Sequence, residues 1–196
     1  MAYCHQKHHQ GLSMVSRFIA LLLLIFVSPL FIIISFLIWI EDGFPIFFKQ
    51  KRVGVNYSFF QIYKFRSMKK NTPNVATHLL GDPKKFLLQS GSLIRKFSLD
   101  ELPNLFNILN GDMVFVGPRP ALYNQDDLMA LRIVVGVEKL KPGITGWAQI
   151  NGRDEISLEE KVALEKEYLE RKSFWLDLKI ILLTITSVLE SKGVKH

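Results

Sequence analysis

Two adjacent carboxylates, Asp100 and Glu101, follow the basic pair Arg95 and Lys96 after three intervening residues. Basic neighbours favour the ionised form of a carboxyl group, and an ionised carboxylate can act as a nucleophile or a metal ligand. Adjacent side chains on a helix point about 100° apart, whereas the two carboxyls of a glycosidase face each other across the scissile bond. The pair therefore suits one acid that attacks phosphorus while its neighbour holds a divalent cation, for which Mg²⁺ is the natural choice.

The same residues also have a purely structural interpretation. Ser98 and Glu101 have the spacing of a capping box, and acids in a first turn complement the helix dipole. The pattern predicts a helix from Ser98 that stops at Asn110. Pro103 would then fall at the fifth helical position, where it costs a hydrogen bond, and a helix start beside arginines is typical of a phosphate site. The residues alone leave both interpretations open.

Further cations could meet an anionic substrate. Arg119 lies between Pro118 and Pro120, which stiffen the backbone that presents its guanidinium. Lys64 and Arg66 are two residues apart on a predicted strand and share one face. An ordinary turn and a solvated strand face explain these two features equally well. A loop that contains three glycines and Trp147 supplies two further candidates for substrate binding, Gln149 and Arg153.

The elements that must position these residues predict a mainly helical α/β fold with a small β-hairpin. Segments 46–50 and 58–65 are rich in Ile, Phe and Tyr and flank turn residues at 54–56. A short strand is expected at 113–116, and residues 143–152 read as irregular or strand. Besides the helix that begins at Ser98, helices are expected at 122–134, at 157–171 after a capping box of Ser157 and Glu160, and at 174–189. The last one suits either the membrane interface or the core.

Composition narrows the class of protein. The chain has 196 residues, 48% of them hydrophobic, one cysteine and a net charge of +7. That length favours one domain with a sizeable core, and a lone cysteine excludes a disulfide scaffold. The positive charge indicates nucleic acid, an acidic membrane surface or a phosphorylated substrate as partner. Nucleic-acid motifs, P-loops, GxGxxG and CxxC pairs are all missing, so no nucleic-acid partner is expected.

Much of the apolar content lies in one run, from Phe18 to Ile40, which carries no charge. Its length suffices to cross a bilayer core. Ser28 and Pro29 interrupt it at the middle, where proline kinks or breaks a helix. Basic residues occur on both sides, so the charges favour no spanning orientation. A kinked spanning helix and two half-helices that return to the same side both fit.

The expected division is a polar tail (1–16), a membrane segment (17–41) and a catalytic domain (42–196).

Several motifs together resemble the bacterial sugar transferases, and most closely the small monotopic phosphoglycosyl transferases. The resemblance rests on motifs that keep their order and spacing from about residue 20 to the end of the chain. They are Ser28-Pro29, Lys64-Phe65-Arg66-Ser67-Met68, Ser98-Leu99-Asp100-Glu101-Leu102-Pro103, Asn110-Gly111-Asp112-Met113, Val116-Gly117-Pro118-Arg119-Pro120, Lys141 to Gln149, and Ser173-Phe174 with Asp177-Leu178-Lys179.

The resemblance implies transfer of a sugar phosphate from a UDP-sugar to a polyprenol (undecaprenyl) phosphate, with release of UMP. In this family the aspartate attacks the β-phosphate and forms a covalent intermediate, so Asp100 would be the nucleophile and Glu101 would hold Mg²⁺. Arg95, Arg119 and Arg153 would contact phosphates or the nucleotide. The hydrophobic run would be re-entrant in the inner leaflet of the bacterial cytoplasmic membrane, with interfacial helices and the catalytic domain on the cytoplasmic face.

Two other classes of protein compete with this hypothesis. A single-span membrane adaptor that binds anionic lipid or a protein partner would place the N-terminus in the periplasm. A soluble protein would bury residues 18–40 as a core helix. The sequence predicts neither the sugar nor the oligomeric state.

Overall fold

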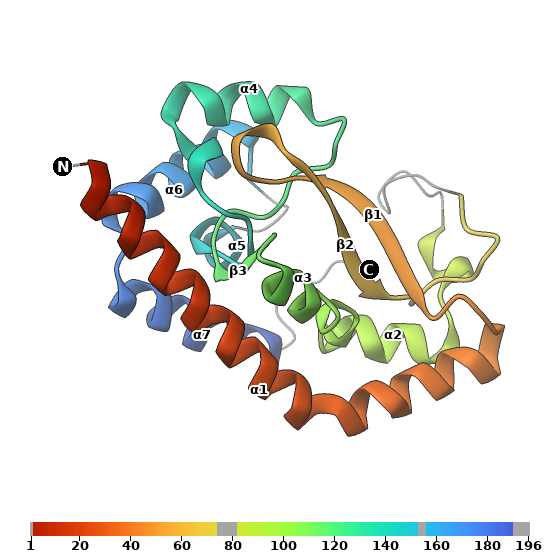
Figure 1. The fold of residues 1–196 in the computed structure, drawn as a ribbon. Helices are drawn as coiled ribbons and strands as arrows, with labels where there is room; N and C mark the ends of the chain where they lie inside the picture. Colours follow the sequence, from red (N-terminus) through yellow and green to blue (C-terminus); the bar gives the residue numbers. More distant parts are fainter. Residues whose placement is uncertain (1, 74–81, 153–155, 190–196) are drawn as a thin grey trace.

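The computed structural model describes residues 2–73, 82–152 and 156–189, without the side chains of 2–13. Figure 1 shows a mostly helical molecule with two small sheets, whose long first helix follows the lower edge. The elements in chain order are α1 (Ala2–Asp42), β1 (Phe47–Val53), η1 (Val55–Tyr57), β2 (Phe59–Phe65), η3 (Pro83–Phe86), α2 (Gln89–Lys96), η4 (Leu99–Glu101), α3 (Asn104–Asn110), β3 (Val114–Val116), α4 (Asp126–Val135), η5 (Val137–Lys139), β4 (Gly143–Thr145), α5 (Trp147–Asn151), α6 (Leu158–Arg171) and α7 (Phe174–Leu189).

The predicted hairpin is confirmed. Strands β1 and β2 pair in antiparallel register, with Phe47 opposite Phe65 and Val53 opposite Phe59. Asn56 and Tyr57 in the connection both have positive φ, as tight reversals of this kind require. Side chains alternate along β2, so Ile62, which is buried, and Lys64 lie on one face, while Phe65 is buried on the other.

A second, parallel pair joins β3 to β4, with Val116 opposite Thr145. This pairing confirms the strand predicted at 113–116. The helices predicted at 122–134 and 174–189 are also confirmed, with small changes at their ends. The interpretation of 143–152 as irregular or strand is wrong for its second half, where α5 forms directly after Gly146. The predicted capping box is confirmed, because Ser157 and Glu160 each accept a hydrogen bond from the other's backbone N–H.

Helix α1 bends near its middle, and its two halves run in different directions (Figure 1). Pro29 lies inside this helix, and since proline has no N–H the carbonyl of Ile25 loses its normal partner four residues on. The Ser28 hydroxyl donates to that same carbonyl at 2.8 Å. The expected proline kink is therefore accompanied by a local replacement for the hydrogen bond that proline removes.

The two halves of α1 pack on different parts of the core. Ala20 in the first half packs against a cluster of α3 and β2 that contains Ile108 and Ile62. Ile34 and Ile38 in the second half pack against Phe65 of β2, Leu88 at the start of α2 and Ile94 within α2. The bend thus lets one helix follow the curved underside of the domain.

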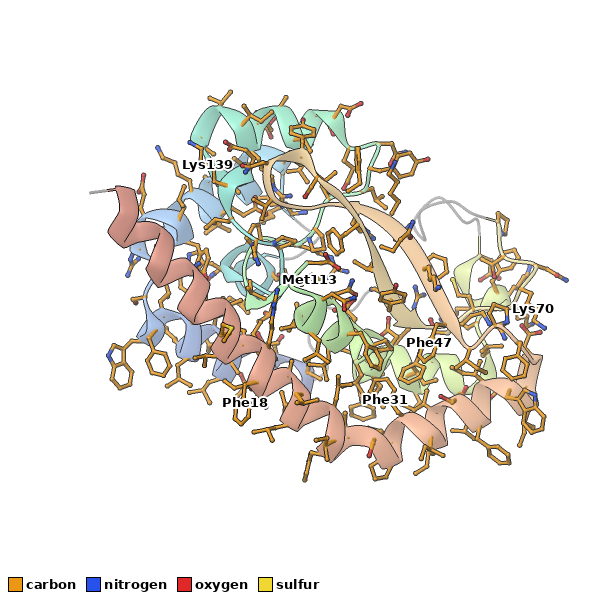
Figure 2. All side chains as sticks on the ribbon, viewed as in Figure 1. Phe18, Phe31, Phe47, Lys70, Met113 and Lys139 are labelled. Carbon is orange, nitrogen blue, oxygen red and sulfur yellow. The ribbon has the colours of Figure 1, made fainter. Side chains whose placement is uncertain are left out.

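The opposite face of α1 is apolar and exposed. Phe18 and Phe26 are 62% and 82% exposed, and large apolar side chains project outward along the helix (Figure 2). Within the described residues, Met14–Asp42 is the one stretch long and apolar enough to cross a membrane, and only 11% of its most apolar window is buried. A buried core helix, as in the soluble alternative, is therefore wrong. A patch of this size marks a surface that meets lipid or another apolar partner.

Candidate active site

The backbone at the carboxylate pair differs from the predicted helix. Residues 99–101 form the single 3₁₀ turn η4, and Ser98 before it has φ of 54°. The Ser98 side chain makes no capping hydrogen bond, so the capping box predicted for Ser98 and Glu101 is wrong. The physical reason lies in Glu101, whose carboxylate is held by two cations from other parts of the chain instead of by the Ser98 backbone.

The expected cost of Pro103 is also absent. Helix α3 begins only at Asn104, and Pro103 takes the N-cap position. The N–H groups at a helix start have no partner within the helix, so proline loses nothing there. The carboxylates therefore lie on a separate turn before a helix of seven residues, and the geometry gives no reason to assign a phosphate to the helix start.

One buried amide fixes β2 against α3. The Asn107 side chain accepts from the N–H of Tyr63 at 3.2 Å and donates to the carbonyl of Gln61 at 2.7 Å. Asn107 is fully buried, so loss of these bonds would leave unsatisfied polar groups at about 1–3 kcal/mol each. This contact holds the strand that carries Lys64 beside η4.

Lys64 and Arg119 converge on the carboxylate pair. The Lys64 ammonium lies 2.7 Å from Glu101 Oε1 and 3.9 Å from Asp100 Oδ2. The Arg119 guanidinium lies 3.3 Å from the same oxygen of Glu101. The side chains of Lys64, Asp100 and Glu101 are 14–19% exposed, whereas that of Arg119 is 40% exposed. The dyad is therefore mostly buried, and Arg119 remains the more accessible cation.

The surroundings shift the pKa values of the two carboxyl groups in opposite directions. For Asp100, burial raises the pKa above the ordinary 3.8, and the charges of Lys64, Arg95 and Arg119 only partly offset it. For Glu101, burial also raises the pKa, but the charges of Lys64 and Arg119 outweigh it and lower the value to about 2. The cations thus lower the pKa of Glu101, as expected, whereas at Asp100 burial outweighs them and the pKa moves up. Such a difference is typical of carboxyl pairs with two distinct roles.

A small pocket opens beside Glu101. Its lining includes Lys64, Arg119, Arg52 and Asn104 together with apolar residues of β2 and β4. Two buried polar atoms in this lining, Arg52 Nε and Asn104 Oδ1, have no hydrogen-bond partner among the described residues. Buried polar groups without a partner are costly. A ligand or a water molecule that accepts from Arg52 Nε or donates to Asn104 Oδ1 would therefore be stabilised here.

Sequence reasoning missed both Arg52 and Asn104. Arg52 donates to the carbonyl of Pro120 at 3.0 Å and to the Gln50 side chain at 2.6 Å. Burial and the charge of Arg119 lower its pKa to about 10. A buried cation beside another cation favours an anion between them. In the sequence Arg52 stands among Lys49 and Lys51 and resembles a solvated strand face, so no local signal distinguishes it.

The structure brings together only some of the predicted substrate-binding residues. Arg95 at the end of α2 is close enough to lower the pKa of Asp100. Gln149 on α5 is not in the pocket lining, but it donates to the carbonyl of Ile144, which lines the pocket. Arg66 is not brought to the dyad: it is buried, pairs with Asp42 and donates to the carbonyls of Gly43 and Pro45. Arg66 thus fixes the connection between α1 and β1. Arg153 lies outside the described residues.

A comparison with protein families matches residues 10–191 to the bacterial sugar transferase model. The match covers most of α1, the carboxylate pair and every cation described at the site. The chain belongs to the bacterial sugar transferase family. Its members include the sugar transferase EpsL of Bacillus subtilis (strain 168), which is 44% identical over 90% of this chain and 86% of its own length.

Two larger bacterial sugar transferases are also similar. The UDP-glucose:undecaprenyl-phosphate glucose-1-phosphate transferase of Escherichia coli (strain K12) is 37% identical, over 85% of this chain but only 38% of its own length. The UDP-N-acetylgalactosamine-undecaprenyl-phosphate N-acetylgalactosaminephosphotransferase of Aeromonas hydrophila is 34% identical, over 95% of this chain and 44% of its own length. The chain thus spans less than half of these two relatives.

Replacement of Lys64 by methionine is expected to raise the pKa of both dyad carboxyls. Lys64 favours the ionised form of Asp100 and of Glu101, so without its charge each group takes up a proton at a higher pH. Carbon NMR titration of labelled Asp and Glu measures this. Lys49→Met, an exposed lysine on β1, is the matched control and should leave both values unchanged. Unchanged values in Lys64→Met would contradict the assigned pairing.

Proposed function

We propose that this chain transfers a sugar phosphate from a UDP-sugar to a polyprenol phosphate and releases UMP. The observation that carries the proposal is the buried Asp100–Glu101 dyad, held by Lys64 and Arg119 beside a pocket. Two of the relatives are named as transferases that use a UDP-sugar and undecaprenyl phosphate. The family match at residues 10–191 contains the whole of this site, which supports carrying the reaction over to this chain.

In the first step the Asp100 carboxylate oxygen attacks the phosphorus that bears the sugar. A phosphorus–oxygen bond forms to Asp100, and the bond to the UMP oxygen breaks with its electron pair leaving on UMP. Arg119, the more exposed cation, and Lys64 stand where they can balance the charge of the diphosphate and of the departing phosphate.

In the second step an oxygen of the polyprenol phosphate attacks the same phosphorus and displaces the Asp100 carboxylate. The sugar then carries a diphosphate linked to the lipid, and Asp100 is again ionised. Because the transfer is divided into two displacements, the water-soluble donor and the lipid acceptor need not occupy the site together. One small pocket with one set of cations is therefore sufficient for both substrates.

Mg²⁺ is the cofactor that we propose for this site. Among the described residues no three His, Cys, Asp or Glu side chains gather as a metal cluster. The carboxylate of Glu101 and the unpartnered oxygen of Asn104 nevertheless line one pocket, and Mg²⁺ commonly takes one or two such oxygens and completes its shell with phosphates and water. The donor set fits, with Glu101 and Asn104 as holders. The bound ion would neutralise charge on the diphosphate.

We further propose that α1 is re-entrant in the inner leaflet of the bacterial cytoplasmic membrane. Its bend at Ser28 and Pro29, its exposed apolar face and the packing of both halves on one domain support this. Helix α7 adds exposed aromatic side chains, Phe174 and Trp175, which suit the interface. Lipid phosphate and soluble nucleotide would then meet at the cytoplasmic surface.

Asp100→Asn is expected to abolish UMP release from a UDP-sugar in the presence of polyprenol phosphate, by at least about 10³-fold, because the nucleophile is lost. A panel of UDP-sugars is first screened to find the donor. Without acceptor, wild-type protein should retain radiolabelled sugar after denaturation and the variant should not. Asp126→Asn, an exposed acid at the start of α4, serves as control. Full activity of Asp100→Asn would refute the dyad assignment.

Glu101→Gln is expected to lower the rate strongly and to weaken its dependence on Mg²⁺, because the amide is a poorer ligand than the carboxylate. UMP release measured across a Mg²⁺ titration tests this. Glu159→Gln, on the exposed first turn of α6, should retain the wild-type Mg²⁺ curve. Undiminished wild-type activity in EDTA would argue against the metal.

Topology is tested with Cys4, the one cysteine of the chain. A re-entrant α1 places Cys4 on the same side as the catalytic domain, so an impermeant maleimide should label it in inverted vesicles and not in intact cells. A cysteine introduced at the exposed Glu159 of a Cys4→Ser variant reports the side of the domain. Labelling of the two positions from opposite sides would establish a spanning helix, as in the adaptor hypothesis.

A further inference from the structure

The segment that carries Arg119 is held almost entirely through its carbonyl groups. Pro118 and Pro120 have no N–H to donate. Four consecutive carbonyls, of Pro118, Arg119, Pro120 and Ala121, instead accept from the N–H of Gly143 (3.0 Å), from Arg132 (2.9 Å), from Arg52 (3.0 Å) and from the N–H of Val53 (3.0 Å). The carbonyl of Arg119 itself is bound by a side chain that has no other part in the proposed reaction.

That side chain, Arg132 of α4, forms a buried ion pair with Glu165 of α6. Its Nε lies 2.8 Å from Glu165 Oε2 and its Nη2 lies 2.5 Å from Glu165 Oε1. The two residues are 4% and 3% exposed. The Nη2 group therefore serves two acceptors at once, a carboxylate oxygen of Glu165 and the carbonyl of Arg119.

Stability alone is a weak reason for such a pair. Taking two charges out of water costs so much that replacement of a buried ion pair by apolar side chains is often neutral or stabilising. What apolar side chains cannot supply is a donor with a fixed direction. A guanidinium is planar, and two parallel bonds to a carboxylate fix its orientation. Here that orientation directs the remaining N–H of Nη2 at Arg119.

We infer that Arg132 and Glu165 are positioning residues that hold the backbone of Arg119 so that its guanidinium meets Glu101 and the substrate phosphates. Glu165 orients Arg132, Arg132 fixes the Arg119 carbonyl, and Arg119 reaches the dyad at 3.3 Å. Only the contact of Arg119 with substrate phosphates rests on the proposed function, since the contact between Arg119 and Glu101 exists without substrate.

The test removes both charges together in the variant Arg132→Met/Glu165→Leu, so that no buried charge is left unpaired. Its thermal unfolding should match the wild type or exceed it. The KM for the UDP-sugar should rise about 10- to 100-fold, as expected for a lost hydrogen bond to a charged group, and kcat should fall as well, because Arg119 also balances the charge of the departing phosphate. The control, Lys166→Ala/Glu170→Ala, removes an exposed ion pair on the same helix α6 and should change neither constant.

A second comparison asks whether the pair acts through Arg119. In an Arg119→Ala background the same double replacement should change KM by less than twofold, because the group that it positions is already absent. A KM increase of the same size in both backgrounds would overturn the inference, and so would an unchanged KM in the otherwise wild-type chain. If the double variant does not fold, Glu165→Gln, which keeps the shape and one acceptor, is carried through the same cycle and should show a smaller loss with the same dependence on Arg119.

A third measurement needs no enzymatic activity. If Arg119 shifts, its guanidinium leaves Oε1 of Glu101, so the side-chain ¹⁵N NMR signal of Arg119, assigned by its loss in Arg119→Ala, should move in the double variant and stay in place in the Lys166/Glu170 control. An unmoved signal overturns the inference even if the reaction is as proposed. A moved signal in a chain that releases no UMP from any UDP-sugar supports the positioning role and refutes the proposed function.

Discussion

The single oxygen Oε1 of Glu101, shared between Lys64 and Arg119, is the contact on which this site depends. It joins three segments, the hairpin, the 3₁₀ turn and the Pro-Arg-Pro segment. Along the chain, Lys64 is 37 residues and Arg119 is 18 residues away from Glu101. A buried carboxylate is tolerated only when cations offset the loss of water. The elements around the dyad can therefore be understood as the means of bringing two cations to one acid, while burial raises the pKa of the neighbouring acid, Asp100.

Local signals allowed much of the fold to be predicted. The hairpin, the capping box at Ser157 and the proline kink depend on residues close together in the chain, and each is present. The turn at Ser98 depends on distant partners. Its residues match a capping box as well as any sequence can, but Lys64 and Arg119 compete for Glu101 with full charges against a single backbone N–H. Contacts of this range leave no trace in a local pattern.

The residues of the candidate site divide in the same way, into those that the sequence indicated and those that depend on distant contacts. Asp100, Glu101 and Arg119 were recognisable because their motifs together resemble a known family, whereas the residues alone also fit a capped helix and an ordinary turn. Arg52 was not, because its burial arises from the contact of β1 with the segment at Leu122. Arg66 has a sequence context much like that of Lys64, yet it fixes the connection after α1. Alternation along the strand gives the face of a residue but not the neighbour that covers that face.

The hydrogen bond from Ser28 to the carbonyl of Ile25 has a consequence for the geometry of the whole molecule. A bend in hydrocarbon normally needs a neighbouring helix or a water molecule for the freed carbonyl, whereas this one is satisfied within a single turn of α1. In the proposed re-entrant arrangement, a lone helix would therefore keep its angle among lipid chains. Since both arms of that helix pack on the rest of the chain, the angle would then set the height of Asp100 above the plane of the lipid headgroups. The acceptor would then be selected first by the height at which its phosphate lies.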